Sequence, residues 1–176
     1  MVLKAQAARY QRDMLAFAAR YGPGPVTFFR APGRVNLIGE HTDYNHGYVM
    51  PMALDKDVLV LARRREDQMV NLVNVELSFS GRQFRISQEI PAQPIGDWGN
   101  YAQGAAQLLE REWGPGLRGY DALIDGGTPH GVPRGAGLSS SSALTVAHAV
   151  TLANLNNLKL EGPALAETCG RAEWYV

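Results

Sequence analysis

Four side chains that can bind the hydroxyl groups of a polyol lie within ten residues of one another. They are Arg34, Glu40, His41 and Asp43, in the segment 31–45, whose sequence is APGRVNLIGEHTDYN. Hydroxyl groups both donate and accept hydrogen bonds, so a sugar site needs carboxylate, imidazole and guanidinium groups that converge with fixed geometry. The apolar residues between Arg34 and Glu40 predict a short buried strand that ends in a polar loop. A charged surface turn is the alternative, because charged residues are mostly exposed.

A second segment has the composition of an anion-binding loop. Residues 133–143 read PRGAGLSSSSA, and glycines allow backbone N–H groups to approach a bound anion closely. A helical apolar pattern follows from Ala143, so the loop leads into a helix N-terminus, which favours a phosphate. The segment has no Gly-Lys-Ser/Thr, no third glycine of a dinucleotide fingerprint and no Gly-x-Ser-x-Gly elbow. A flexible linker or a simple helix cap is the alternative.

Together these segments resemble the galactokinases, within the GHMP family of small-molecule kinases. The first signature is GRVNLIGEHTDYN, followed by His46 and Gly47, and the second is GVPRGAGLSSSSA, which is similar to the family's ATP-phosphate loop. A weaker third match is the segment 97–101, DWGNY, similar to a Trp-x-Asn-Tyr stretch found between the other two. The resemblance extends from about residue 28 to the last residue.

The resemblance implies a kinase that uses MgATP to phosphorylate galactose at its anomeric hydroxyl, giving galactose 1-phosphate. It implies that Arg34 is catalytic and lies near the reacting hydroxyl and the transferred phosphate. The sugar hydroxyls would be held by Glu40, His41, Thr42 and Asp43. The ATP phosphates would be wrapped by Gly135, Ala136, Gly137, Leu138, Ser139, Ser140 and Ser141.

The remaining implied contacts concern the adenine and the metal. The resemblance implies that Trp98 and Tyr101 lie near the adenine. It implies that Mg²⁺ is bound by Ser140 or Ser141 and by Glu173, which is similar to the family's acidic ligand. One hydroxyl and one carboxylate suit Mg²⁺, which keeps phosphate and water among its ligands.

The resemblance covers only part of the family's sequence. Galactokinases are roughly twice as long, as two-domain chains are, and their catalytic Asp lies in a Met-Asp-Gln segment that would follow Val176. We therefore expect residues 1–176 to be an incomplete GHMP kinase N-terminal domain without its C-terminal domain, and inactive alone. Two alternatives stay open: a kinase for N-acetylgalactosamine or a related sugar, and a non-catalytic sensor that binds galactose and ATP.

The hydrophobic pattern predicts helices and strands in an order that favours the α+β class. The resemblance implies the same class, as a GHMP kinase N-terminal domain (ribosomal protein S5 domain 2-like) with a mixed or antiparallel sheet packed against helices. The sequence predicts an amphipathic helix over 3–21, ended by Gly22-Pro23-Gly24-Pro25. Strands are predicted from 26–29 and over 48–52, 58–62, 69–75, 79–86 and 120–124, and helices over 98–113, after the serines, and from about Pro163.

The composition excludes several classes of function. Lys+Arg equals Asp+Glu at 17 each, and the basic run 63–65 is followed by two acids, so we expect a solvated strand end and no nucleic-acid partner. We expect no membrane partner and a cytoplasmic protein, since no apolar run reaches the length of a membrane span. The single cysteine, Cys169, excludes an internal disulfide and is expected in the core. The oligomeric state stays open.

A zinc hydrolase is a further alternative, because Glu40, His41, Asp43 and His46 are all potential metal ligands. The two histidines are five residues apart, however, which does not place both on one helix face. Stoichiometric zinc in purified protein would support this alternative.

Overall fold

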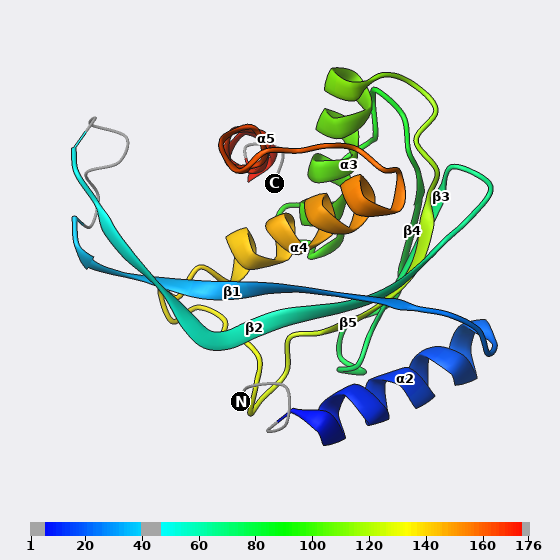
Figure 1. Cartoon of the computed structure of the whole chain (residues 1–176), viewed down its shortest axis with the longest axis horizontal. Helices are drawn as coiled ribbons and strands as arrows, with labels where there is room; N and C mark the ends of the chain where they lie inside the picture. Colours follow the sequence, from blue (N-terminus) through cyan, green and yellow to red (C-terminus); the bar gives the residue numbers. More distant parts are fainter. Residues whose placement is uncertain (1–5, 40–46, 174–176) are drawn as a thin grey trace.

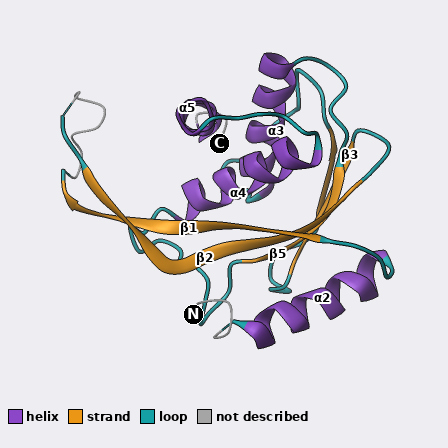
Figure 2. Ribbon diagram, viewed as in Figure 1, coloured by secondary structure: helices purple, strands orange, loops and turns teal. Residues whose placement is uncertain are grey.

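One mixed sheet separates two helical layers. The computed structural model describes residues 6–39 and 47–173. Over these residues α3, α4 and α5 lie on one face of the sheet, and α2 lies on the other (Figure 1). The sheet has five strands in the order β1-β2-β5-β3-β4, and all neighbours are antiparallel except β3 and β5. This α+β arrangement, drawn by element type in Figure 2, confirms the predicted fold class.

The first two strands form one long antiparallel hairpin. β1 (Thr27–Ile38) pairs with β2 (Met50–Arg64), with Phe29 opposite Val60. The sequence predicted two separate strands over 48–52 and 58–62, which was wrong, because both belong to β2. β2 continues through the polar residues 55–57, and its pairing with β1 shifts register there, from Asp57 opposite Pro32 to Ala53 opposite Arg34.

The far end of this hairpin is more exposed than the sequence predicted. The side chains of Leu37 and Ile38 are 56% and 67% exposed, although their apolar character predicted burial. Both strands run on beyond the helical layer at this end (Figure 1), so the strand was predicted correctly and its burial was wrong.

Three shorter strands complete the sheet. They are β3 (Met69–Asn74), β4 (Arg82–Arg85) and β5 (Tyr120–Asp125). The predicted strand over 79–86 is therefore reduced to four residues. β3 runs parallel to β5, with Leu72 beside Ala122, because the connection between them carries β4 and a helix.

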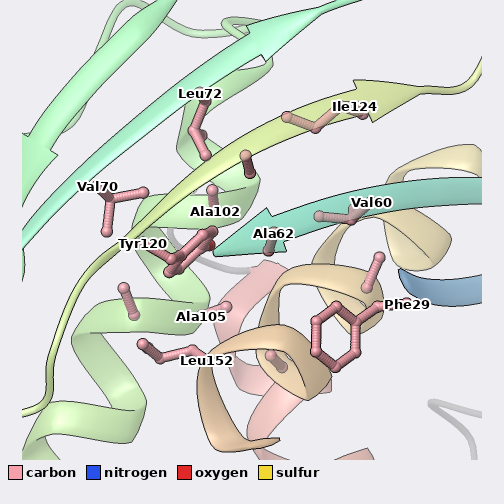
Figure 3. Packing of buried hydrophobic residues seen from close by; sticks show 14 of the residues in the cluster. Phe29, Val60, Ala62, Val70, Leu72, Ala102, Ala105, Tyr120, Ile124 and Leu152 are labelled. Atoms are coloured by element: carbon pink, nitrogen blue, oxygen red, sulfur yellow. The ribbon is translucent and has the colours of Figure 1, made fainter. Parts of the chain in front are cut away.

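The main core lies between the sheet and the three helices of one layer, α3 (Gly99–Trp113), α4 (Ser140–Leu155) and α5 (Gly162–Ala172). Figure 3 shows Phe29, Val60 and Ile124 of the sheet together with Leu152 of α4, all members of this core. Cys169 belongs to the same cluster, as predicted. α3 and α5 begin close to the predicted positions, whereas α4 begins earlier, within the serines.

One polar pair is fully enclosed in this core. The Tyr120 hydroxyl lies 2.9 Å from Nδ1 of His148, and both residues are at most 1% exposed. Burial lowers the pKa of His148 to about 3, so the imidazole is neutral at physiological pH. The pair joins the start of β5 to the middle of α4.

The other face of the sheet is covered by α2 (Ala7–Tyr21). The helix was predicted, and the apolar spacing of Tyr10, Met14, Phe17 and Tyr21 was partly right about its buried face. Phe17 is buried, and Tyr10 and Tyr21 pack against the same cluster, but Met14 is 45% exposed. Arg9 and Asp13 are also buried, and charged residues carry no apolar periodicity that could have predicted this.

The buried charges of α2 form an ion-pair network with the sheet. Arg9 contacts Asp57 of β2 at 2.7 Å and Asp125 of β5 at 2.9 Å. Arg12 pairs with Asp13 and with Asp125, and Arg30 of β1 pairs with Asp57. Removing one member of such a buried network leaves an uncompensated charge, which makes the network a specific clamp for α2.

The basic run 63–65 is structural. Arg63 donates hydrogen bonds to the carbonyl oxygens of Tyr21 and Gly22 at the end of α2, and Arg65 pairs with Asp67 and Asp121. Arg64 is exposed, as predicted, but its two neighbours are only half-exposed because of these contacts.

Of the helices in the described ranges, none combines the length and the apolar character needed to span a bilayer.

Candidate functional site

The loop before α4 has the backbone geometry of an anion-binding site. Gly135, Gly137 and Ser139 have φ of 67°, 69° and 57°, so left-handed residues alternate with residues of negative φ. Such an alternation turns consecutive backbone N–H groups into a concavity that suits an anion. Ser139 adopts this conformation without being glycine, which is an uncommon and strained arrangement.

The helix that follows begins earlier than its apolar pattern predicted. α4 starts at Ser140, so Ser140 and Ser141 belong to its first turn, and Ser139 is the N-cap residue. The Ser139 side chain makes no capping hydrogen bond. The first-turn N–H groups and the helix dipole therefore favour a negatively charged ligand at this end.

A pocket of about 250 Å³ opens beside this helix end. The pocket brings together Trp98, Tyr101, Ser140 and Ser141, four residues that the sequence assigned to the nucleotide. Its other lining residues come from the sheet and the loops around it: Val58, Asn74, Glu76, Phe79, Gly96, Ile124, Gly126, Val132, Arg134 and Leu144. Aromatic side chains and a helix N-terminus in one cavity suit a ligand with a flat ring and an anionic tail.

The aromatic side of the pocket is rigidly held. Trp98 is 9% exposed, and its Nε1 donates to the carbonyl oxygen of Ser80 at 3.2 Å. The Phe79 ring meets the Trp98 ring edge to face, with centroids 6.4 Å apart. Arg82 forms a bidentate ion pair with Asp97, the residue before Trp98, so β4 fixes the start of α3.

Arg34 lies on β1, next to the anion-binding loop. Its backbone N–H donates to the carbonyl oxygen of Leu138 at 3.1 Å. Its guanidinium is exposed, and Nη1 donates to Oδ1 of Asn36 at 2.8 Å. A Cβ on Gly33 would lie 2.8 Å from Cγ1 of Val132, so the strand and the loop are in close contact. The structure therefore joins the predicted catalytic arginine to the predicted phosphate loop.

Two of the three predicted metal ligands line the pocket, and the third does not. Ser140 and Ser141 line the pocket, and their hydroxyl oxygens are suitable ligands for Mg²⁺. Glu173 caps α5 outside the residues that line the pocket. Its negative charge adds to burial in raising the pKa of the Cys169 thiol to about 11. Within 6–39 and 47–173 no three acidic, histidine or cysteine side chains cluster as a metal site.

The predicted sugar ligands cannot be placed in the same way. Glu40, His41, Thr42 and Asp43 lie outside the described residues, and so does His46 of the zinc alternative.

Several pocket residues carry no role in the sequence analysis. Asn74 and Glu76 end β3 and begin the loop after it, and Phe79 was assigned only to a half-buried strand. Arg134 offered the one available signal, because it lies inside the glycine- and serine-rich segment. The others become neighbours of that segment only through the fold.

Two family models match the chain in separate parts. The galactokinase galactose-binding signature matches residues 15–64, and the GHMP kinases N terminal domain matches residues 100–176. Both parts of the chain are therefore similar to GHMP kinases. The first match contains Arg34, and the second contains the anion-binding loop, so the two halves of the site coincide with the two models.

Curated relatives are galactokinases. The chain is 46% identical over 159 residues to a galactokinase of Chloroflexus aurantiacus, and 45% identical over 161 residues to one of a Roseiflexus species. These matches cover 90% and 89% of the chain, but only 39% and 38% of the relatives.

Solved structures of two kinases share the fold. A Lactococcus lactis galactokinase complexed with galactose superposes with a TM-score of 0.84 at 32% identity, over 94% of this chain and 42% of that one. A mevalonate kinase of Methanococcus jannaschii superposes with a TM-score of 0.70 at 19% identity, over 86% of this chain and 47% of that one. The second match shows a common fold only.

Proposed function

We propose that the protein containing this chain transfers the terminal phosphoryl group of ATP to the anomeric hydroxyl of galactose. The observation that carries the proposal is the hydrogen bond from the Arg34 N–H to the Leu138 carbonyl oxygen. It joins the strand within the galactose-binding signature to the loop that suits phosphate. The similarity to galactokinases, one of them solved with galactose, supports the same activity.

In this proposal the pocket binds ATP along its length. The adenine lies at the aromatic end, near Trp98 and Tyr101, where the rings supply apolar contact area. The phosphates lie at the first turn of α4, where N–H groups of the loop hold them without a lysine. Residues 135–141 are all assigned to this role.

The chemistry asks the protein mainly for alignment and charge stabilisation. We assign Arg34 to the transferred phosphoryl group, because a guanidinium keeps its charge and presents two parallel donors. The family resemblance assigns Mg²⁺, which would neutralise phosphate charge when bound, to Ser140 or Ser141 and to Glu173, although Glu173 lies outside the residues that line the pocket. The family resemblance assigns the sugar hydroxyls to Glu40, His41, Thr42 and Asp43, and the base to an Asp beyond Glu173.

The whole protein provides the test, because the chain spans about two fifths of its relatives' length. ADP formation with MgATP should depend on added galactose. ADP formation at the same rate without sugar would show an ATPase. Galactose binding without any ADP formation would favour the sensor alternative.

A further inference from the structure

Arg134 connects the anion-binding loop to the aromatic side of the pocket. Its two Nη atoms donate to the two carboxylate oxygens of Glu76 at 2.8 and 2.9 Å. Its guanidinium also lies over the Phe79 ring, 4.6 Å from the centroid. Exposed ion pairs usually add little to stability, but a bidentate pair stacked on a ring has the geometry in which arginine is most effective.

Both partners of Arg134 are themselves fixed. The Glu76 N–H donates to Oδ1 of Asn74 at 2.8 Å, at the end of β3. Phe79 packs edge to face on Trp98, which is anchored as described above. Arg134 therefore contacts a preformed wall rather than a loose surface loop.

The loop itself has few anchors of its own. Residues 133–137 are exposed, and two of them are glycines with left-handed backbone. At its far end the loop is tied to β1 through Leu138. At the N-terminal end of the loop, Arg134 makes the corresponding contact. It links the loop to Glu76 and Phe79, on the aromatic side of the pocket.

We propose that Arg134 and Glu76 are positioning residues for the nucleotide. This inference rests on the proposed function: the ion pair sets the separation between the aromatic side of the pocket, with Phe79 and Trp98, and the anion-binding loop. It thereby sets the affinity for ATP, not the affinity for sugar. The charge of Arg134 is matched by Glu76, so its effect comes from position and not from attraction of phosphate.

Glu76→Gln distinguishes these two roles in the whole protein. It removes the carboxylate charge and one of the two acceptors of Arg134 while preserving the size of the side chain. A positioning role predicts weaker nucleotide binding, with the Kd for MgADP in calorimetry and the KM for ATP rising about five- to tenfold. A direct phosphate contact restrained by Glu76 predicts tighter binding, and that result would overturn the inference.

Arg134→Gln and the double variant with Glu76→Gln complete a double-mutant cycle. If the two residues act as one unit, the double variant loses no more affinity than either single variant. Losses that multiply, or singles that leave the Kd unchanged, would contradict the inference. The KM for galactose should stay within twofold, which a general loss of structure would not allow. Arg85→Gln is the matched control, since Arg85 is exposed and donates to the side chain of Gln68.

Failure of the proposed function is separable from failure of this inference. If the wild-type protein binds MgADP but transfers no phosphate to galactose, the proposed function fails, and the cycle in calorimetry still decides the role of the pair. If it binds no nucleotide, both fail.

Discussion

At the scale of single residues, Arg34 connects the two halves of the site. Its backbone is bound to the anion-binding loop and its guanidinium to Asn36, so both its position and its direction are constrained. A planar fork that is already oriented loses little entropy when it binds a phosphoryl group. Its place in the structure is therefore consistent with a role in the transition state.

Arg34→Lys tests this role, because it keeps the charge and loses the fork. We expect kcat of the whole protein to fall by about a hundredfold or more, as on loss of a transition-state donor. The affinity for nucleotide should change little. Arg64→Lys, on an exposed arginine of β2, is the control in the same steady-state assay. A kcat within a factor of a few of wild type would exclude Arg34 from the transition state.

At the scale of elements, the site depends on how closely β1 approaches the loop before α4. Gly33 allows this approach, since an added Cβ would lie 2.8 Å from Val132 Cγ1 and 3.0 Å from the Leu138 carbonyl oxygen. A backbone atom on one side leaves little room for adjustment. The contact therefore fixes where Arg34 lies relative to the phosphate loop.

Gly33→Ala should destabilise the protein by about 1–3 kcal/mol, the usual cost of overpacking. Chemical denaturation measures it as a shift in the unfolding midpoint. Gly162→Ala is a matched control, because a Cβ there meets nothing within 4 Å. Equal midpoints for the two variants would show that the strand and the loop are not in tight contact.

The ion-pair network under α2 makes a second prediction at this scale, concerning pH. Burial, together with the neighbouring Asp125 carboxylate, raises the pKa of Asp13 from 3.8 to about 6 despite its bond to Arg12. The folded state thus binds this proton more tightly than the unfolded state does. The Asp13 contribution to the free energy of unfolding therefore falls as pH rises from about 4 to about 6.

Asp13→Asn should remove this pH-dependent contribution, because an amide does not titrate in this range. The amide can still accept a hydrogen bond from Arg12 and can donate one to Asp125. Relative to wild type, the variant should gain stability as pH rises from 4 to 7, by about 1–3 kcal/mol. Denaturation curves across this range provide the measurement, with exposed Asp55→Asn as the control for the lost charge. A difference that is constant with pH would contradict the raised pKa of Asp13.

At the scale of the whole molecule, local sequence patterns predicted the helices and strands better than the burial of their charged residues and the contacts between distant segments. The order of helices and strands, the α+β class and the loop before α4 all follow from periodicity and glycine placement. The burial of Arg9 does not, because its charge is balanced by Asp57 and Asp125 far along the chain. The contact of Glu76 and Phe79 with Arg134 is equally non-local, since it arises only when β3 and β5 lie side by side.

In the proposed function, these elements form part of a galactose kinase site. The most direct measurement incubates the whole protein with MgATP and a panel of sugars, and identifies the phosphorylated product by ³¹P NMR. We expect galactose 1-phosphate, with a higher kcat/KM for galactose than for N-acetylgalactosamine. Faster turnover of N-acetylgalactosamine, or phosphate on another hydroxyl, would contradict it.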